Sequence, residues 1–382
     1  MSFRYASAIN KPGFNPLGVQ TSTTEYFPYL YSWGRNTGGQ LGLGNSTTYS
    51  SPKQVGALTD WNVSSSGSNF TVAIKSDGTA WSWGSGGNGG LGLNNTAYYL
   101  SPKQIGSLTN WATVTNTAYS TLAIKTDSTL WSWGGNAYGQ LGLNNTTEYS
   151  SPKQVGTLTN WEKVSGGTNH VMAVKTDGTM WGWGRNQFGQ LGLTPASFYY
   201  SISSPKQVGA LTTWKNVSAG LSHSVAVKID GTIWSFGRGD YGQLGLNNTS
   251  IYSSPKQIGA LTTWSITASC DNSTVAVKTD GTLWSWGWNS KGELGLGDTA
   301  NRSSPTQVGS LTTWLKLAAA RYTFASIKTD ATLWTWGYNA YGTLGINNAT
   351  NYSSPKQVGN RTTWLNVFSS RQDANCFTAT LY

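Results

Sequence analysis

The chain has 382 residues, of which only 10% are charged, whereas glycine (47) and tryptophan (20) are unusually frequent. Helix-forming patterns are scarce, so the composition favours many short strands joined by tight turns. Two cysteines cannot make a disulfide framework, no apolar run is long enough for a membrane span, and the first five residues lack the apolar core of a secretory signal.

The net charge of +10 raises the question of nucleic-acid binding. About half of the basic residues are framework lysines that recur once per repeat, such as Lys53, Lys103 and Lys153 in Ser-Pro-Lys-Gln. A nucleic-acid binder concentrates its charge on one patch, whereas these lysines are expected to spread evenly around the molecule. The sequence therefore argues against specific nucleic-acid binding.

Residues 1–25 belong to no repeat. The segment Lys11–Leu17 is too rich in proline and glycine for a helix, and it predicts an extended N-terminal arm. A disordered tail is one interpretation, and an arm that docks onto a larger assembly is the other.

Residues 26–382 consist of repeats of about 50 residues. Each repeat predicts four strands, which in one copy are Trp161–Ser165, Val171–Lys175, Thr179–Trp183 and a strand around Pro152–Val155 of the preceding copy. Asp177-Gly178 is a hairpin signal, and the proline of the fourth strand suits an outer edge. One repeat is three residues longer, within Thr194–Ser203. The repeated end of the third strand is an aromatic-Gly pair, found at Trp33, Trp83, Trp133, Trp183, Phe236, Trp286 and Trp336.

The two ends of the chain hold complementary parts of one repeat. The pattern starts at Tyr29–Gly34 with a third strand, and it finishes at Trp364 and Phe377–Tyr382 with a first and a second strand. The sequence therefore predicts an all-β fold, a seven-bladed β-propeller of four-stranded blades, with the ring closed by one blade shared between the N- and C-terminal strands.

Variation between the copies predicts a recognition face. The turns after the second strand and the Gly-x-Leu-Thr-x-Trp connections are nearly constant, whereas the other two connections differ between copies and share the opposite face. Arginine and aromatic residues are typical of binding hot spots, and we favour recognition over neutral drift at exposed loops. The candidate binding residues are Arg35, Tyr138, Arg185, Phe188, Arg238, Tyr241, Trp288, Lys291, Tyr338, Tyr341 and Arg371.

No pattern indicates a catalytic site, a metal site or a cofactor. All tryptophans but Trp288 occupy three repeating columns, as core residues do. His170 and His223 share one column whose other members are not metal ligands, so a structural role is expected. The repeated aspartates stand alone before turns without further oxygen ligands.

The repeated motif of Asp177–Gly192, Asp-Gly-Thr-x-Trp-x-Trp-Gly-x-Asn-x-x-Gly-Gln-Leu-Gly, resembles the regulator of chromosome condensation repeat. The resemblance covers about residues 26–382 and implies a seven-bladed propeller. It does not imply one function, because the family includes a nucleotide-exchange factor for a small nuclear GTPase and protein inhibitors of β-lactamases. No motif of the exchange activity is recognisable here.

These observations lead to three hypotheses about function. The first is a non-enzymatic structural or binding propeller that recognises a protein partner or a larger assembly. The near-identical copies and the short arm resemble propellers of tailed bacterial viruses, which suggests a virion accessory protein on capsid or tail. The second is a module that binds host-surface glycans, and the third is a regulator of a small GTPase.

Overall fold

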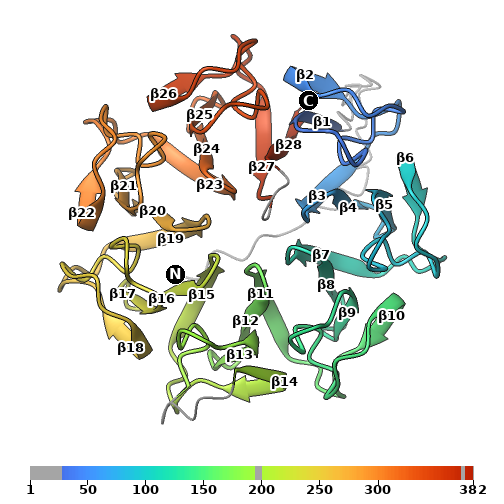
Figure 1. The fold of residues 1–382 in the computed structure, drawn as a ribbon, viewed down its shortest axis with the longest axis horizontal. Coiled ribbons are helices and arrows are strands. Elements are labelled where there is room, and N and C mark those ends of the chain that lie inside the picture. Colours follow the sequence, from blue (N-terminus) through green and yellow to red (C-terminus); the bar gives the residue numbers. More distant parts are fainter. Residues whose placement is uncertain (1–27, 194–199, 371–374, 382) are drawn as a thin grey trace, which may run out of the picture.

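The computed structural model describes residues 28–193, 200–370 and 375–381. Within them, 28 strands form seven sheets of four antiparallel strands, which Figure 1 shows as blades around a central axis. The predicted all-β seven-bladed propeller is therefore confirmed. The predicted arm at residues 1–25 lies outside the described residues. No described segment forms a helix that is long and apolar enough to cross a membrane.

Six blades follow one another along the chain, with their strands in sequence order from the centre of the ring to its rim. Blade 1 contains β3 (Trp61–Ser66), β4 (Phe70–Lys75), β5 (Ala80–Gly84) and β6 (Tyr99–Gln104). Blade 2 contains β7 (Trp111–Asn116), β8 (Ser120–Lys125), β9 (Leu130–Gly134) and β10 (Tyr149–Gln154). Blade 3 contains β11 (Trp161–Gly166), β12 (His170–Lys175), β13 (Met180–Arg185) and β14 (Ser201–Gln207).

The next three blades repeat this order. Blade 4 contains β15 (Trp214–Ala219), β16 (His223–Lys228), β17 (Ile233–Gly237) and β18 (Tyr252–Gln257). Blade 5 contains β19 (Trp264–Ser269), β20 (Ser273–Lys278), β21 (Leu283–Gly287) and β22 (Arg302–Gln307). Blade 6 contains β23 (Trp314–Ala320), β24 (Thr323–Lys328), β25 (Leu333–Gly337) and β26 (Tyr352–Gln357).

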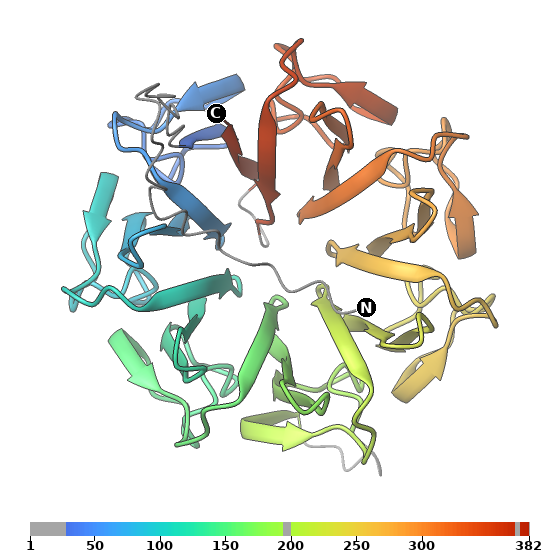
Figure 2. The same ribbon diagram turned by 180° about the vertical axis from the view of Figure 1, so that it is seen from behind.

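The seventh blade is shared between the two ends of the chain. It contains β27 (Trp364–Phe368), β28 (Cys376–Leu381), β1 (Tyr29–Gly34) and β2 (Tyr49–Gln54), in that order from centre to rim. β1 and β28 pair along their whole length, from Tyr29 opposite Leu381 to Gly34 opposite Cys376. Both views show the two terminal strands side by side (Figures 1 and 2), so the predicted closure is confirmed.

Within a blade the fourth strand is the least regularly paired. In blade 3 the register between β13 and β14 shifts between Gly182 and Gly184. Pro205 lies in β14 and has no N–H group for a ladder, and β14 has no neighbouring strand on its outer side. The prediction that the proline-containing strand is the outer one is therefore confirmed.

Tryptophan side chains hold neighbouring blades together. Trp183 at the end of the third strand is 0% exposed, and its Nε1 donates a hydrogen bond to the backbone oxygen of Gln140 in the blade before (2.9 Å). Trp161 at the start of the first strand meets Trp183 edge-to-face, with 5.9 Å between ring centroids. The same contacts recur around the ring, and they confirm a core role for these two columns. The third predicted column, which includes Trp181, is partly buried and packs against the core.

The lysines before the Asp-Gly turns recur around the ring as expected, but several are buried. The Nζ of Lys175 lies 3.8 Å from the ring centroid of Trp181 and 4.7 Å from that of Trp161, and the residue is 3% exposed. Desolvation lowers the pKa of Lys175, while the cation is stabilised by the two aromatic faces. Such lysines pack between the tryptophans of two columns, and they add little charge to the surface.

Candidate functional site

The connections between strands fall on two faces of the disc because successive strands run in opposite directions. One face carries the Asp-Gly turns and the connections between blades, which are tied together by hydrogen bonds such as that from Trp111 N to Gly78 O (3.1 Å). The opposite face carries the loops that follow β1, β5, β9, β13, β17, β21 and β25, and the connections between the first two strands of each blade. We call it the variable face.

The two most variable loop positions contact each other across blade junctions. The residue directly after the aromatic-Gly pair packs on the residue that occupies the second variable position in the preceding blade. The contact occurs between the following pairs, with distances to the ring centroid: Arg35 and Tyr341 (5.4 Å), Arg185 and Tyr138 (5.0 Å), Arg238 and Phe188 (5.1 Å), Trp288 and Tyr241 (5.2 Å, stacked).

Constant loop residues fix the backbone that presents these side chains. In the loop after β9, Asn136 Oδ1 accepts the N–H of Leu141 (2.9 Å), and Gln140 Oε1 accepts the N–H of Tyr138 (2.9 Å). The same glutamine contact recurs in the next two loops. The framework asparagine and glutamine therefore hold the variable residue in one position while its side chain changes.

From blade 4 to blade 6 the ring contacts form a continuous chain, which we call the aromatic arc (Tyr241, Trp288, Tyr322, Tyr338 and Tyr341). The centroid of Trp288 lies 5.6 Å from Tyr322, Tyr322 lies 6.1 Å from Tyr338, and Tyr338 lies 6.3 Å from Tyr341, all three edge-to-face. Edge-to-face pairs are favoured by the quadrupole of the rings. An arginine lies at each end of the arc: Arg238 is 5.5 Å from the ring centroid of Tyr241, and Arg35 is 5.4 Å from that of Tyr341.

The aromatic arc borders a pocket of about 280 Å³. We call it the arc pocket; its lining residues are Trp288, Lys291, Glu293, Arg321, Tyr322, Tyr338, Tyr341 and Asn375.

Glu293 is the acidic group of the arc pocket and is 1% exposed. Its Oε2 accepts the N–H of Lys291 (2.7 Å), whereas Oε1 has no hydrogen-bond partner among the described residues. Burial raises the pKa of Glu293 to about 7, although hydrogen bonds to the carboxylate and the charge of Lys291 act in the opposite direction.

Some cations of the variable face are paired with carboxylates. Arg238 Nε lies 2.8 Å from Asp240 Oδ2, and Arg321 Nε lies 3.4 Å from Asp271 Oδ2. The positive charge of this face is therefore smaller than a count of its arginines indicates.

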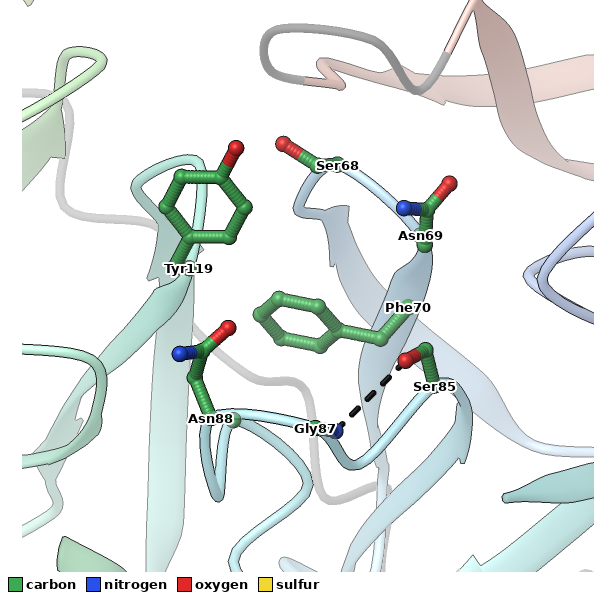
Figure 3. Close-up of a pocket in the computed structure, with 8 residues that line it drawn as sticks. Ser68, Asn69, Phe70, Ser85, Gly87, Asn88 and Tyr119 are labelled. Atoms are coloured by element: carbon green, nitrogen blue, oxygen red, sulfur yellow. Dashed lines mark hydrogen bonds between the residues drawn. The ribbon is translucent and has the colours of Figure 1, made fainter. Parts of the chain in front are cut away.

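The part of the variable face between blades 1 and 2 has a different character. Figure 3 shows a small pocket there, and its labelled lining residues are Ser68, Asn69, Phe70, Ser85, Gly87, Asn88 and Tyr119. Ser85 and Asn88 occupy the two variable positions that hold arginine or aromatic residues in most other blades. The contacts of arginine side chains with aromatic rings therefore lie on the rest of the face.

Ten of the predicted site residues lie on the variable face, and eight of them take part in the cross-junction contacts. The other two, Lys291 and Tyr338, line the arc pocket, and Arg371 lies outside the described residues. That these residues bind a partner remains a prediction.

Sequence reasoning did not select four residues of this face. They are Tyr200, which contacts Arg185, and the pocket residues Arg321, Tyr322 and Glu293. Glu293 could have been found from the sequence, because it is an acidic residue in a loop column that four other copies fill with glutamine. Tyr200 lies within the longer stretch Thr194–Ser203, so no other copy indicated its position.

The two histidines have a structural environment. His170 and His223 are 0% exposed, and their Nε2 atoms contact the hydroxyls of Ser224 (3.1 Å) and Thr274 (3.0 Å) in the next blade. Burial lowers the pKa of His223 to about 3, which keeps the ring neutral. Over the described ranges, no three or more His, Cys, Asp or Glu side chains are grouped to hold a metal ion.

Comparison with solved structures supports the fold. Human WBSCR16 is 19% identical with a TM-score of 0.82, over 93% of this chain and 99% of that chain. Prp20p from Saccharomyces cerevisiae, described with its binding properties to Gsp1p and histones, is 19% identical with a TM-score of 0.81, over 94% and 92% of the two chains. Yeast RCC1 (Prp20) with Kap60 bound is 18% identical with a TM-score of 0.81, over 93% and 89%.

Comparison with family models matches every copy of the repeat. The model of the regulator of chromosome condensation (RCC1) repeat matches residues 29–74, 77–124, 127–174, 177–227, 230–277, 280–325 and 330–371. A second model of the same repeat matches residues 63–89, 161–190, 214–243 and 265–293. The chain therefore belongs to the regulator of chromosome condensation (RCC1) repeat family.

Proposed function

We propose that this chain is a non-enzymatic binding propeller that recognises a protein partner through the variable face. The observation that carries the proposal is that the residues which differ most between otherwise uniform blades contact one another there. Tyrosine, tryptophan and arginine dominate this set, and these residue types dominate hot spots of protein interfaces.

The contacts between these side chains favour binding in a second way. An arginine that is packed on an aromatic ring has already lost much of its rotamer freedom, and so has a ring within the aromatic arc. A surface that is already ordered loses less conformational entropy when a partner binds to it. Arg185 is an example, because its guanidinium group lies near the rings of both Tyr138 and Tyr200 (5.0 and 5.3 Å from the centroids).

The comparisons agree with a protein as the class of partner. Prp20p is described as binding Gsp1p and histones, and a complex with Kap60 is known. At 18–19% identity the likeness concerns the fold, so it supports neither these partners nor GTPase regulation for this chain. The virion and glycan hypotheses receive no support from the comparisons.

The test compares one variant on each face. A tagged wild-type chain is used to isolate partners from its native source after crosslinking, and binding of the recovered partner is then measured. The variable-face variant carries Arg185→Ala, Arg238→Ala and Trp288→Ala. The opposite-face variant carries Leu108→Ala, Leu158→Ala and Leu261→Ala, at leucines that are 46–51% exposed.

We expect the variable-face variant to lose at least about tenfold in affinity, since hot-spot residues each contribute about 2 kcal/mol or more. The opposite-face variant should bind as the wild type does. Loss of binding in the opposite-face variant alone would overturn the proposal. Both variants need an unchanged circular dichroism spectrum, so that unfolding is not mistaken for loss of a contact.

A further inference from the structure

The second carboxylate oxygen of Glu293, Oε1, has no hydrogen-bond partner among the described residues. The equivalent residues of four other loops are glutamines (Gln40, Gln140, Gln190 and Gln243), and one oxygen of each accepts the loop N–H that Glu293 Oε2 accepts in blade 5. Glutamine supplies that acceptor without a charge, and the two remaining copies, with Gly90 and Thr343, form the loop without it. The negative charge at residue 293 therefore needs another explanation.

The ionised form of Glu293 is only partly compensated by its surroundings, because burial outweighs its hydrogen bonds and the charge of Lys291. Among the described charged groups that line the arc pocket, Lys291 has an exposed side chain in contact with water, and Arg321 is directed to Asp271 (3.4 Å) and to the ring of Tyr322 (5.0 Å). Tyr322, Tyr338 and Tyr341 contribute no cation to this lining. A buried carboxylate without a close ion pair is costly, which is consistent with its raised pKa.

The arc pocket has walls suited to an organic cation. Trp288, Tyr322, Tyr338 and Tyr341 line it together with Glu293. Aromatic faces attract an ammonium group through the ring quadrupole, and the carboxylate adds a charge-assisted hydrogen bond. At about 280 Å³ the pocket lies at the lower end of the range of small-molecule pockets, about 300–1,000 Å³. This volume suits one side chain of a larger partner.

We propose that the arc pocket receives the ammonium group of a lysine side chain of the protein partner, with Glu293 as its counter-ion and the aromatic arc around its methylene chain. This inference rests on the proposed function, because the lysine belongs to the protein that the variable face recognises. Lysine fits better than an anion, since Glu293 would repel a carboxylate or phosphate.

A small probe tests the pocket without the partner. Nα-acetyl-lysine N-methylamide is titrated into the full chain and its binding is followed by saturation-transfer NMR; the matched probe is Nα-acetyl-norleucine N-methylamide, which lacks the ammonium group. We expect the lysine probe to bind at pH 8 at least about tenfold more tightly than the norleucine probe, given the strength of a hydrogen bond between charged groups. Equal binding of the two probes, or no binding of the lysine probe, would overturn the inference.

The Glu293→Gln variant is a control that the chain itself supplies, because glutamine occupies this position in four other blades. We expect it to fold normally, to lose at least about tenfold in affinity for the lysine probe, and to keep its affinity for the norleucine probe. Unchanged binding of the lysine probe to this variant would contradict the role of Glu293.

The pH dependence gives an independent readout. Because protonation of Glu293 removes its charge while the lysine probe stays protonated, binding should weaken between pH 8 and pH 6 in the wild type and stay constant in Glu293→Gln. A flat wild-type profile would contradict the inference.

Measurements with the whole partner separate the two proposals. If Glu293→Gln binds the partner as the wild type does while the variable-face variant does not, the partner places no lysine in the arc pocket, and the proposed function stands. If the variable-face variant also keeps full affinity, the proposed function fails.

Discussion

At the scale of single residues, Glu293 has an energetic consequence that can be measured without any ligand. Its pKa in the folded chain is about 7, raised from 4.5 by burial. The folded chain therefore binds more protons at this residue than the unfolded chain between these two values, and stability falls as pH rises through this window. Above pH 7 the full penalty of the buried charge is present.

We therefore predict that Glu293→Gln stabilises the protein at pH 8 by an amount on the order of 3 kcal/mol, and that this gain disappears towards pH 5. Urea unfolding at the two pH values measures it. The reciprocal variant Gln140→Glu, in an equivalent loop position, should acquire the pH dependence that Glu293→Gln loses. A gain from Glu293→Gln that is the same at both pH values would mean that Glu293 carries no buried charge.

Tryptophans in the core and on the variable face should differ in their contribution to stability. Trp133 is 0% exposed, and its Nε1 donates to Gly90 O (2.9 Å), so Trp133→Ala should cost about 3–5 kcal/mol. Trp288 has only its stacking on Tyr241 and an edge contact with Tyr322 to lose, so Trp288→Ala should cost about 1 kcal/mol. Urea unfolding of the two variants provides the comparison. Equal losses of unfolding free energy would contradict the division between core and surface tryptophans.

At the scale of elements, two of the hairpin turns between second and third strands depart from Asp-Gly. Ser128 and Ala331 adopt positive φ angles of 61° and 58°, where the equivalent Gly178 has 75°. A left-handed conformation is unfavourable for residues with a Cβ atom and free of this cost for glycine. These two turns are therefore strained relative to the others.

We predict that Ser128→Gly and Ala331→Gly each stabilise the protein by about 0.5–1 kcal/mol, after the larger backbone entropy of glycine in the unfolded chain is taken into account. The reverse change, Gly178→Ala, should destabilise it, because the added Cβ would lie 2.2 Å from Thr212 O. Melting temperatures of the three variants test the pair of expectations. A lower melting temperature for either glycine variant would show that its turn is not strained.

Much of this element structure could be predicted from the sequence because seven copies report on the same strands. The predicted strand Val171–Lys175 differs from β12 (His170–Lys175) by one residue, and the outer strand was identified from its proline. The contact between Arg185 and Tyr138 could not be predicted, because it depends on how far neighbouring blades are rotated. The burial of Lys175 between two tryptophans was missed for the same reason.

At the scale of the whole molecule, the ring is closed by one blade that takes two strands from each end of the chain. Trp33 of β1 lies 6.2 Å from Trp364 of β27 and 6.0 Å from Phe377 of β28, all measured between ring centroids. These contacts join residues more than 300 positions apart in sequence, so the entropy cost of closing the ring is large. Changes in the closing blade should therefore destabilise the fold more than equivalent changes in the other blades.

We predict that removing residues 364–382 lowers the melting temperature and causes aggregation, because the inner edge of β1 loses the ladder with β28 and exposes its N–H and C=O groups. The ring architecture requires this outcome, because the strands of the six intact blades are all used within their own sheets. None of them can replace β28 as the partner of β1. Differential scanning calorimetry and light scattering measure the two effects. Deletion of residues 1–25 is the control, because it removes a similar number of residues without touching a described strand. A soluble monomer with the wild-type melting temperature after the C-terminal deletion would mean that the other six blades hold the ring together without the shared one.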